Sequence, residues 1–250
     1  SLGGLNTPGT NLRAIKSPWA ANNRVTSFWL STNGGAVSTK SVYKLSLSDV
    51  GATFRYVEVG VAADGTVSYR ISAPLVVRAN AFDNAVAPII TGSLVYGSKL
   101  KAIVSTSWAS GTKYSYQWLA NGEVIGGAIN QVFTVGLDVI DKTLSVRVCG
   151  TKTGYETKCL VNSQPGVVSK ATIVNFTEPK IAATAVKIGT VLRANPGKWT
   201  AGSTLSYQWL RDGVAVTGMT DVTYQISQAD LGHSLTFRVT ATKPGYFVLV

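Results

Sequence analysis

The stretch Tyr207-Gln208-Trp209-Leu210-Arg211-Asp212-Gly213 decides the fold of this chain. Beginning at Leu205, every second residue is apolar and large, and this period-two alternation is typical of a β-strand with one buried face. Asp212-Gly213 follows at once, and an Asp-Gly pair favours a tight hairpin turn in which φ is positive. The stretch therefore predicts a strand that runs directly into a hairpin.

The same stretch returns elsewhere in the sequence. Tyr116-Gln117-Trp118-Leu119 repeats it, with Asn121-Gly122 at the turn, and Trp29-Leu30 marks a more divergent copy. All six tryptophans fall into three pairs whose members are ten positions apart, and successive pairs are separated by 89 and then 91 residues. Such a period indicates one module built three times. We predict domains at residues 1–80 (divergent), 81–170 and 171–250.

Composition and local pattern both favour strands over helices. Hydrophobic residues make up 45% of the chain, charged residues 14%, and glycine occurs 25 times. No stretch of ten or more residues shows the i, i+3, i+4, i+7 apolar pattern of a helix. Further alternating segments lie at 224–226 and 235–239, and turn signals recur every 8–12 residues. This pattern predicts an all-β chain of antiparallel two-sheet sandwiches.

At these residues the chain resembles the immunoglobulin superfamily, specifically the bacterial immunoglobulin-like tandem repeats of secreted and cell-surface proteins of Gram-positive bacteria. The resemblance is carried by Trp-Leu-Arg-Asp-Gly at 209–213 and by Asp230-x-Gly232. It covers all 250 residues, more loosely in the first copy. It implies three tandem immunoglobulin-like antiparallel β-sandwich domains. The cysteine pair that joins the two sheets in antibody domains is absent, so we expect aliphatic and aromatic burial to stabilise each core.

The second tryptophan of each pair lies in the middle of a predicted strand. We interpret Trp29, Trp118 and Trp209 as core residues, together with Tyr116 and Tyr207.

The first tryptophan of each pair follows a turn-forming segment. Trp19, Trp108 and Trp199 therefore keep two interpretations, as core residues or as partly exposed platforms for a sugar or a partner. Phe28 is a further candidate contact, because Ser27-Phe28 replaces the Tyr-Gln of the sister copies and moves an aromatic ring to the outer face of its strand. Between Leu30 and Gly65 the alignment needs a single-residue bulge. With that bulge Val57 and Val59 are expected to point inward, and Glu58 to face water.

Cys149 and Cys159 are the only cysteines, and they lie symmetrically about Gly154 in a predicted hairpin. Directly opposed residues on antiparallel strands can meet disulfide geometry, so we predict a disulfide between them. Disulfides persist in oxidising compartments, which predicts an extracellular or cell-surface location. A redox-active or metal-binding role has little support, because no CxxC motif or histidine lies nearby in the sequence.

Charge and motif content narrow the functional classes. The net charge of +11 is spread thinly, without a Lys/Arg run, which argues against nucleic acid and allows weak attraction to anionic envelope polymers. The single histidine, His233, has no partners for a catalytic triad. We find no metal-ligand cluster, phosphate loop or cofactor motif, and no apolar run of the roughly 18 residues that span a membrane. The chain begins inside a repeat and stops on an expected strand, so we expect it to be part of a longer protein.

The leading functional hypothesis is a non-catalytic surface or secreted array that acts as a stalk, spacer or lattice element, through self-association or with other surface proteins. The alternative is a module that binds polysaccharide or an anionic wall polymer through loops and exposed tryptophans. An enzyme within this segment is the weakest hypothesis, because acid–base and nucleophilic constellations are missing from the sequence.

Overall fold

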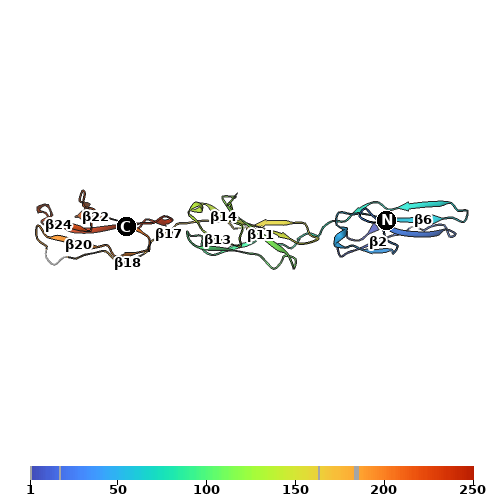
Figure 1. Cartoon of the computed structure of the whole chain (residues 1–250), viewed down its shortest axis with the longest axis horizontal. Coiled ribbons are helices and arrows are strands. Elements are labelled where there is room, and N and C mark those ends of the chain that lie inside the picture. The colour runs from blue at the N-terminus through green and yellow to red at the C-terminus, as the bar shows by residue number, and fades with distance from the viewer. Residues whose placement is uncertain (1, 17, 163, 183–185) are drawn as a thin grey trace. The chain divides into compact units, whose positions relative to one another are not determined.

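The structure is a computed structural model, and it describes residues 2–16, 18–162, 164–182 and 186–250. Extended strands make up each of the three sequence copies (Figure 1). In the described ranges the helical elements are three single 3-10 turns, η1 (Leu47–Asp49), η2 (Leu137–Val139) and η3 (Gln228–Asp230). The prediction of an all-β chain of tandem antiparallel sandwiches is confirmed.

The first copy contains two sheets. Its strands are β1 (Leu2–Gly3), β2 (Asn11–Ala14), β3 (Arg24–Ser31), β4 (Gly35–Ser38), β5 (Val42–Lys44), β6 (Thr53–Val61), β7 (Val67–Ile71) and β8 (Leu75–Val76). One sheet has the order β1-β2-β5 and the other the order β4-β3-β6-β7, with β8 also paired to β6. Figure 1 shows β2 and β6 on the two sides of this copy. Between the sheets lies a core of Leu12, Trp29, Leu45, Ala52, Phe54, Tyr56 and Val77.

The second copy repeats this strand order. Its strands are β9 (Ile89–Thr91), β10 (Lys99–Ile103), β11 (Lys113–Ala120), β12 (Glu123–Val124), β13 (Val132–Thr134), β14 (Thr143–Thr151), β15 (Lys158–Val161) and β16 (Gly166–Val167). One sheet has the order β13-β10-β9 and the other the order β12-β11-β14-β15. Asn121 and Gly122 connect β11 to β12 with φ of 51° and 83°, so the predicted hairpin turn with positive φ is present.

The third copy has a smaller second sheet. Its strands are β17 (Ala171–Thr172), β18 (Asn175–Thr177), β19 (Lys180–Ala182), β20 (Val191–Asn195), β21 (Lys198–Trp199), β22 (Thr204–Arg211), β23 (Val214–Ala215), β24 (Thr223–Gln225), β25 (Leu235–Thr242) and β26 (Tyr246–Phe247). The main sheets have the orders β19-β20-β24 and β23-β22-β25. The core contains Leu192, Ala194, Trp209, Tyr224 and Ile226.

The chain groups into two compact units. The first comprises residues 1–88, 104–116 and 147–161, and the second comprises residues 89–103, 117–146 and 162–250. The first and third sequence copies each lie inside one unit, whereas the second copy is divided between them. The domain boundaries inferred from the repeat stay a prediction.

Candidate functional site

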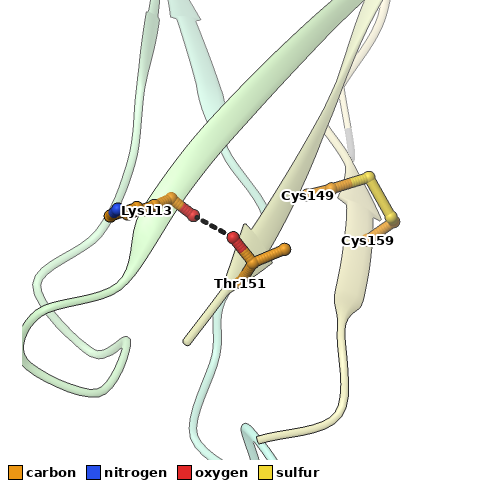
Figure 2. The surroundings of a disulfide bond; sticks show 4 residues. All are labelled: Lys113, Cys149, Thr151 and Cys159. Atoms are coloured by element: carbon orange, nitrogen blue, oxygen red, sulfur yellow. Dashed lines mark hydrogen bonds between the residues drawn. A yellow bond between two sulfur atoms is a disulfide. The ribbon is translucent and has the colours of Figure 1, made fainter. Parts of the chain in front are cut away.

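The predicted disulfide joins Cys149 on β14 to Cys159 on β15 (Figure 2). The two residues are direct partners in the antiparallel register, and their Cα atoms are 4.0 Å apart. Beside the disulfide, the Thr151 hydroxyl donates a hydrogen bond to the Lys113 carbonyl at 3.5 Å, which ties the end of β14 to the start of β11. The disulfide therefore stabilises the β14–β15 hairpin of the second copy.

The middle tryptophans are wholly enclosed. Trp29, Trp118 and Trp209 have 0% exposed surface. Each indole N–H donates to a backbone carbonyl about 11 or 12 residues later, Lys40 at 2.9 Å, Asn130 at 2.9 Å and Asp221 at 2.8 Å. A buried indole needs such a partner, so the repeated bond explains why the same residue type stands at this position in all three copies. Tyr116 and Tyr207 are half-buried at the margin of the core, and Tyr207 stacks on Phe237 at 5.4 Å between ring centroids.

Trp108 is also a packed residue. It is 5% exposed, its indole N–H donates to the Val86 carbonyl at 3.1 Å, and its ring lies 5.1 Å from that of Phe82 and 5.6 Å from that of Tyr114. Its remaining face covers Gly150, where a Cβ atom would come within 2.2 Å of the indole. This ring offers no open face to a sugar.

Trp19 and Trp199 are half-buried. The Arg70 guanidinium lies 4.2 Å from the centre of the Trp19 ring, in a cation–π arrangement, and the Trp19 N–H donates to Glu58 at 3.4 Å. The Trp199 N–H donates to the Pro196 carbonyl at 2.8 Å, and its ring borders a cleft of about 560 Å³ beside β25. A ligand contact at these two rings stays a prediction.

Glu58 corrects one expectation from the sequence. It is 5% exposed rather than in water, and it lies on the inner face of β6 with Phe54, Tyr56 and Gly60, whereas Val57 and Val59, which were expected to point inward, lie on the opposite face. The register between β3 and β6 runs without interruption, and the bulge lies instead between β3 and β4, at Trp29. Because side chains alternate along a strand, this difference of one residue moves the carboxylate to the inner face.

The outer face of the sheet in the first copy is apolar, as the position of Phe28 suggested. Phe28 pairs with Val57, and Val57 pairs in turn with Ile71. On β7 the side chains of Val67, Tyr69 and Ile71 are 48%, 66% and 59% exposed, whereas Phe28 is half-buried and Val57 is buried. We call Phe28, Val57, Val67, Tyr69 and Ile71 the apolar face of the first copy. At the positions of Phe28 and Val57 the third copy has the polar pair Gln208 and Arg238.

The third copy contains a buried charged cluster, of which only the turn-capping role of Asp230 was expected from the sequence. The Asp230 carboxylate accepts hydrogen bonds from the Tyr224 hydroxyl at 2.8 Å and from Arg211 Nε at 2.7 Å, and from both the backbone N–H and the hydroxyl of Ser227 at 2.8 Å. We call Arg211, Tyr224, Ser227 and Asp230 the Asp230 cluster. The Ser-x-x-Asp spacing at 227–230, which also occurs at 46–49, is a capping signal that could have revealed part of it.

The Asp230 cluster stabilises a turn, and the oxygens of its carboxylate are already paired with donors of the protein. Burial alone would raise the pKa of Asp230, but the hydrogen bonds from Ser227, Tyr224 and Arg211 outweigh burial and hold the pKa well below its ordinary value. The carboxylate is therefore charged and fully occupied by protein donors at neutral pH. Across the described ranges no group of three or more His, Cys, Asp or Glu side chains is arranged to hold a metal ion. No helix in those ranges has the length and apolarity that a membrane crossing requires.

Comparisons with known proteins give structural likeness only. No protein family model matches the chain, and no curated protein matches it. Among solved structures, the central fibronectin-III array of RIM-binding protein matches with a TM-score of 0.23 and 11% identity, over 100% of this chain and 94% of that one. The FN1–FN3 domains of chicken CNTN1 match with a TM-score of 0.24 and 9% identity, over 100% and 94%. Values this low assign neither a family nor a function.

Proposed function

We propose that this chain is a non-catalytic spacer or stalk segment that works outside the cell. The observation that carries the proposal is a joint that occurs twice. The backbone N–H of Asn80 donates to the Gly154 carbonyl at 2.7 Å, and 91 residues later the N–H of Ala171 donates to the Gly245 carbonyl at 2.9 Å. Asn80 and Ala171 lie in the segments that join successive copies, which we call the linkers. Each linker is thereby hydrogen-bonded to a turn of the copy that follows it, either between β14 and β15 or between β25 and β26.

Side chains reinforce the first of these joints. Phe82 is 3% exposed and packs between Trp108 and Tyr155, at 5.1 and 4.9 Å between ring centroids. The Lys158 ammonium donates to the Phe82 carbonyl at 2.8 Å. In the second linker Ile173 stands at the equivalent position and is 1% exposed. A linker whose backbone and side chain are both engaged restricts bending, which is what a spacer requires. The disulfide supports an oxidising, extracytoplasmic setting.

The distribution of distances between dyes tests the spacer function. Cysteines introduced at exposed Thr39 and Thr220 carry a donor and an acceptor, and single-molecule energy transfer reports their separation. We expect one narrow population, which a Phe82→Ser substitution broadens because the linker loses its anchor. A broad population in the unmodified chain, or no response to Phe82→Ser, contradicts the proposal.

The apolar face of the first copy favours assembly as a second candidate function. Contiguous exposed apolar side chains on a protein surface mark an interaction site, and the exposed members of this face lie on β7, at the end of its sheet. If two molecules of this protein associated through this face, each would cover the exposed apolar side chains of the other. The double variant Phe28→Gln/Val57→Arg introduces the residue types of the third copy.

Sedimentation velocity over a concentration series tests this second function. We expect concentration-dependent association of the parent chain and its loss in the double variant. A parent chain that remains monomeric at high concentration contradicts assembly through this face.

A further inference from the structure

A positively charged cleft of about 480 Å³ opens beside the turn between β14 and β15, within the first compact unit. Its lining comprises two lysines, Lys113 and Lys152, three threonines and Tyr155, together with Gly111 and the apolar Leu47 of the first copy. The threonines are Thr151, Thr153 and Thr157. None of the lining residues carries a negative charge, although Glu156 lies between two of them in sequence. Its volume falls in the usual range of small-ligand sites, which is roughly 300–1,000 Å³.

The positive charge is held in place by aromatic packing. The Lys152 ammonium lies 4.7 Å from the centre of the Tyr155 ring, and the Tyr155 ring packs on Phe82 at 4.9 Å. A cation that rests on a fixed aromatic ring loses less conformational freedom when it binds an anion. Lys113 begins β11, and the hydrogen bond from the Thr151 hydroxyl to the Lys113 carbonyl joins the start of β11 to the end of β14 (Figure 2).

The third copy shows which of these features belong to the shared architecture. Gly111, Thr151 and Tyr155 have counterparts in Gly202, Thr242 and Tyr246, 91 residues later. The other polar positions change, because Thr204, Pro244 and Val248 replace Lys113, Thr153 and Thr157, respectively.

Lys243 is the counterpart of Lys152, but its surroundings differ. Its ammonium donates to the Ala201 carbonyl at 2.8 Å while lying 4.5 Å from the Tyr246 ring centre, so it is engaged within its own copy. The module folds in the third copy without Lys113, Thr153 and Thr157. These three side chains are therefore not required by the fold, although all three line the same cleft.

We propose that this cleft binds a segment of an acidic polysaccharide. The two ammonium groups pair with carboxylates of the sugar chain, and the threonine hydroxyls exchange hydrogen bonds with sugar hydroxyls, which alternate with the acidic groups along such a polymer. Ammonium groups alone would recognise any polyanion, whereas the row of hydroxyls selects a carbohydrate. The inference does not depend on the spacer function, because a spacer requires no ligand.

Binding of defined polymers to the full chain tests the proposal. Biolayer interferometry at low and physiological salt compares polygalacturonate, which is carboxylated, with dextran, which is neutral, and with inorganic polyphosphate, which has charge but no sugar. The cleft variant is Lys113→Gln/Lys152→Gln. Its matched control, Lys101→Gln/Lys243→Gln, removes the same charge elsewhere. Thr153→Val/Thr157→Val keeps the charge and removes two hydroxyls. Circular dichroism and thermal unfolding establish that each variant is folded.

We expect polygalacturonate to bind and dextran not to bind. The cleft variant should lose about tenfold or more in affinity, since two charge-assisted contacts disappear, while the control pair stays within about twofold. The threonine variant should weaken polygalacturonate about threefold or more and leave polyphosphate unchanged, because each lost neutral hydrogen bond has a modest effect. Three results would overturn the proposal: no binding of polygalacturonate, an equal loss in the control pair, or an unchanged affinity of the threonine variant.

Discussion

In the third copy the turn at η3 is stabilised by the charged Asp230 cluster, whereas the second copy has an apolar set at the same place. Ala120, Phe133, Gly136 and Val139 stand where the third copy has Arg211, Tyr224, Ser227 and Asp230. Val139 is 1% exposed and Phe133 stacks on Trp118 at 5.3 Å. The first copy is intermediate: Tyr43, Ser46 and Asp49 repeat the cluster, and Ser31 replaces the arginine.

This comparison teaches that the turn tolerates a complete polar network or a complete apolar one. A buried carboxylate is stable only when its oxygens are paired, and a donor without its acceptor is costly, so the tyrosine and serine positions change together with the aspartate, whereas the arginine position also varies by itself, as Ser31 shows. The indole N–H resonances of Trp118 and Trp209 report the unfolding of the two copies separately, because each is enclosed in its own core. Substitutions that mix residues of the polar and the apolar network in one copy should therefore change the stability of that copy, and the change can be measured separately for each copy.

The largest effect is expected when a carboxylate is placed in the apolar turn. Val139→Asp buries a charge with no arginine, tyrosine or serine partner, and we expect the second copy to lose about 3–5 kcal/mol. Urea unfolding followed at the Trp118 resonance measures the loss. The Trp209 resonance is the internal control, and an unchanged Trp118 midpoint would show that the second copy can solvate the carboxylate.

The next effect comes from weakening the polar turn. Asp230→Asn removes charge-assisted bonds to Arg211, Tyr224 and Ser227, and we expect the third copy to lose about 1.5–3 kcal/mol. The Trp209 resonance should shift its urea midpoint. Asp138→Asn is the matched control, because Asp138 is exposed and its neighbour Val139 occupies the equivalent of position 230. Equal losses in both variants would contradict the assignment of the stability to the cluster.

Acid should distinguish the two turns without any mutation. The pKa of Asp230 lies below its unfolded value of 3.8, so the cluster stabilises the third copy fully above that value. The stabilisation is lost as the pH falls from about 5 toward the lower, folded pKa. We expect the Trp209 urea midpoint to fall in this range more steeply than in the Asp230→Asn variant. Parallel curves for the parent and the variant would show that other carboxylates dominate.

The smallest effect is expected from a complete exchange. The quadruple variant Arg211→Ala/Tyr224→Phe/Ser227→Gly/Asp230→Val gives the third copy the residues of the second. We expect its stability to differ from the parent by less than about 1.5 kcal/mol, because replacing a whole buried ionic group by apolar residues is often neutral or favourable. Urea unfolding of this variant beside Asp230→Val alone measures the difference. If the quadruple variant were no more stable than the single one, the two turns would not be interchangeable.

The fold was readable from the sequence where the signal is local and repeated. The alternation through Trp209 predicted β22, Asn121-Gly122 predicted the turn between β11 and β12, and the symmetry of Cys149 and Cys159 about Gly154 matches their direct pairing. Glu58 was misplaced because the alignment could not locate the irregular residue, and one position decides the face of a strand. The charged cleft was not visible either, since Lys113 begins β11 whereas Lys152 follows the end of β14, and the two residues line one cleft only in three dimensions.

The disulfide gives the second copy a distinct response to stretching. Ten peptide steps separate Cys149 from Cys159, and the bond holds their Cα atoms 4.0 Å apart. When a pulled copy opens, those steps cannot extend, so its gain in length falls short of an unbridged copy by about 30 Å, taking roughly 3.4 Å for each step. Under a reductant the shortfall would disappear, and the middle of the chain would act as a redox-dependent limit on extension.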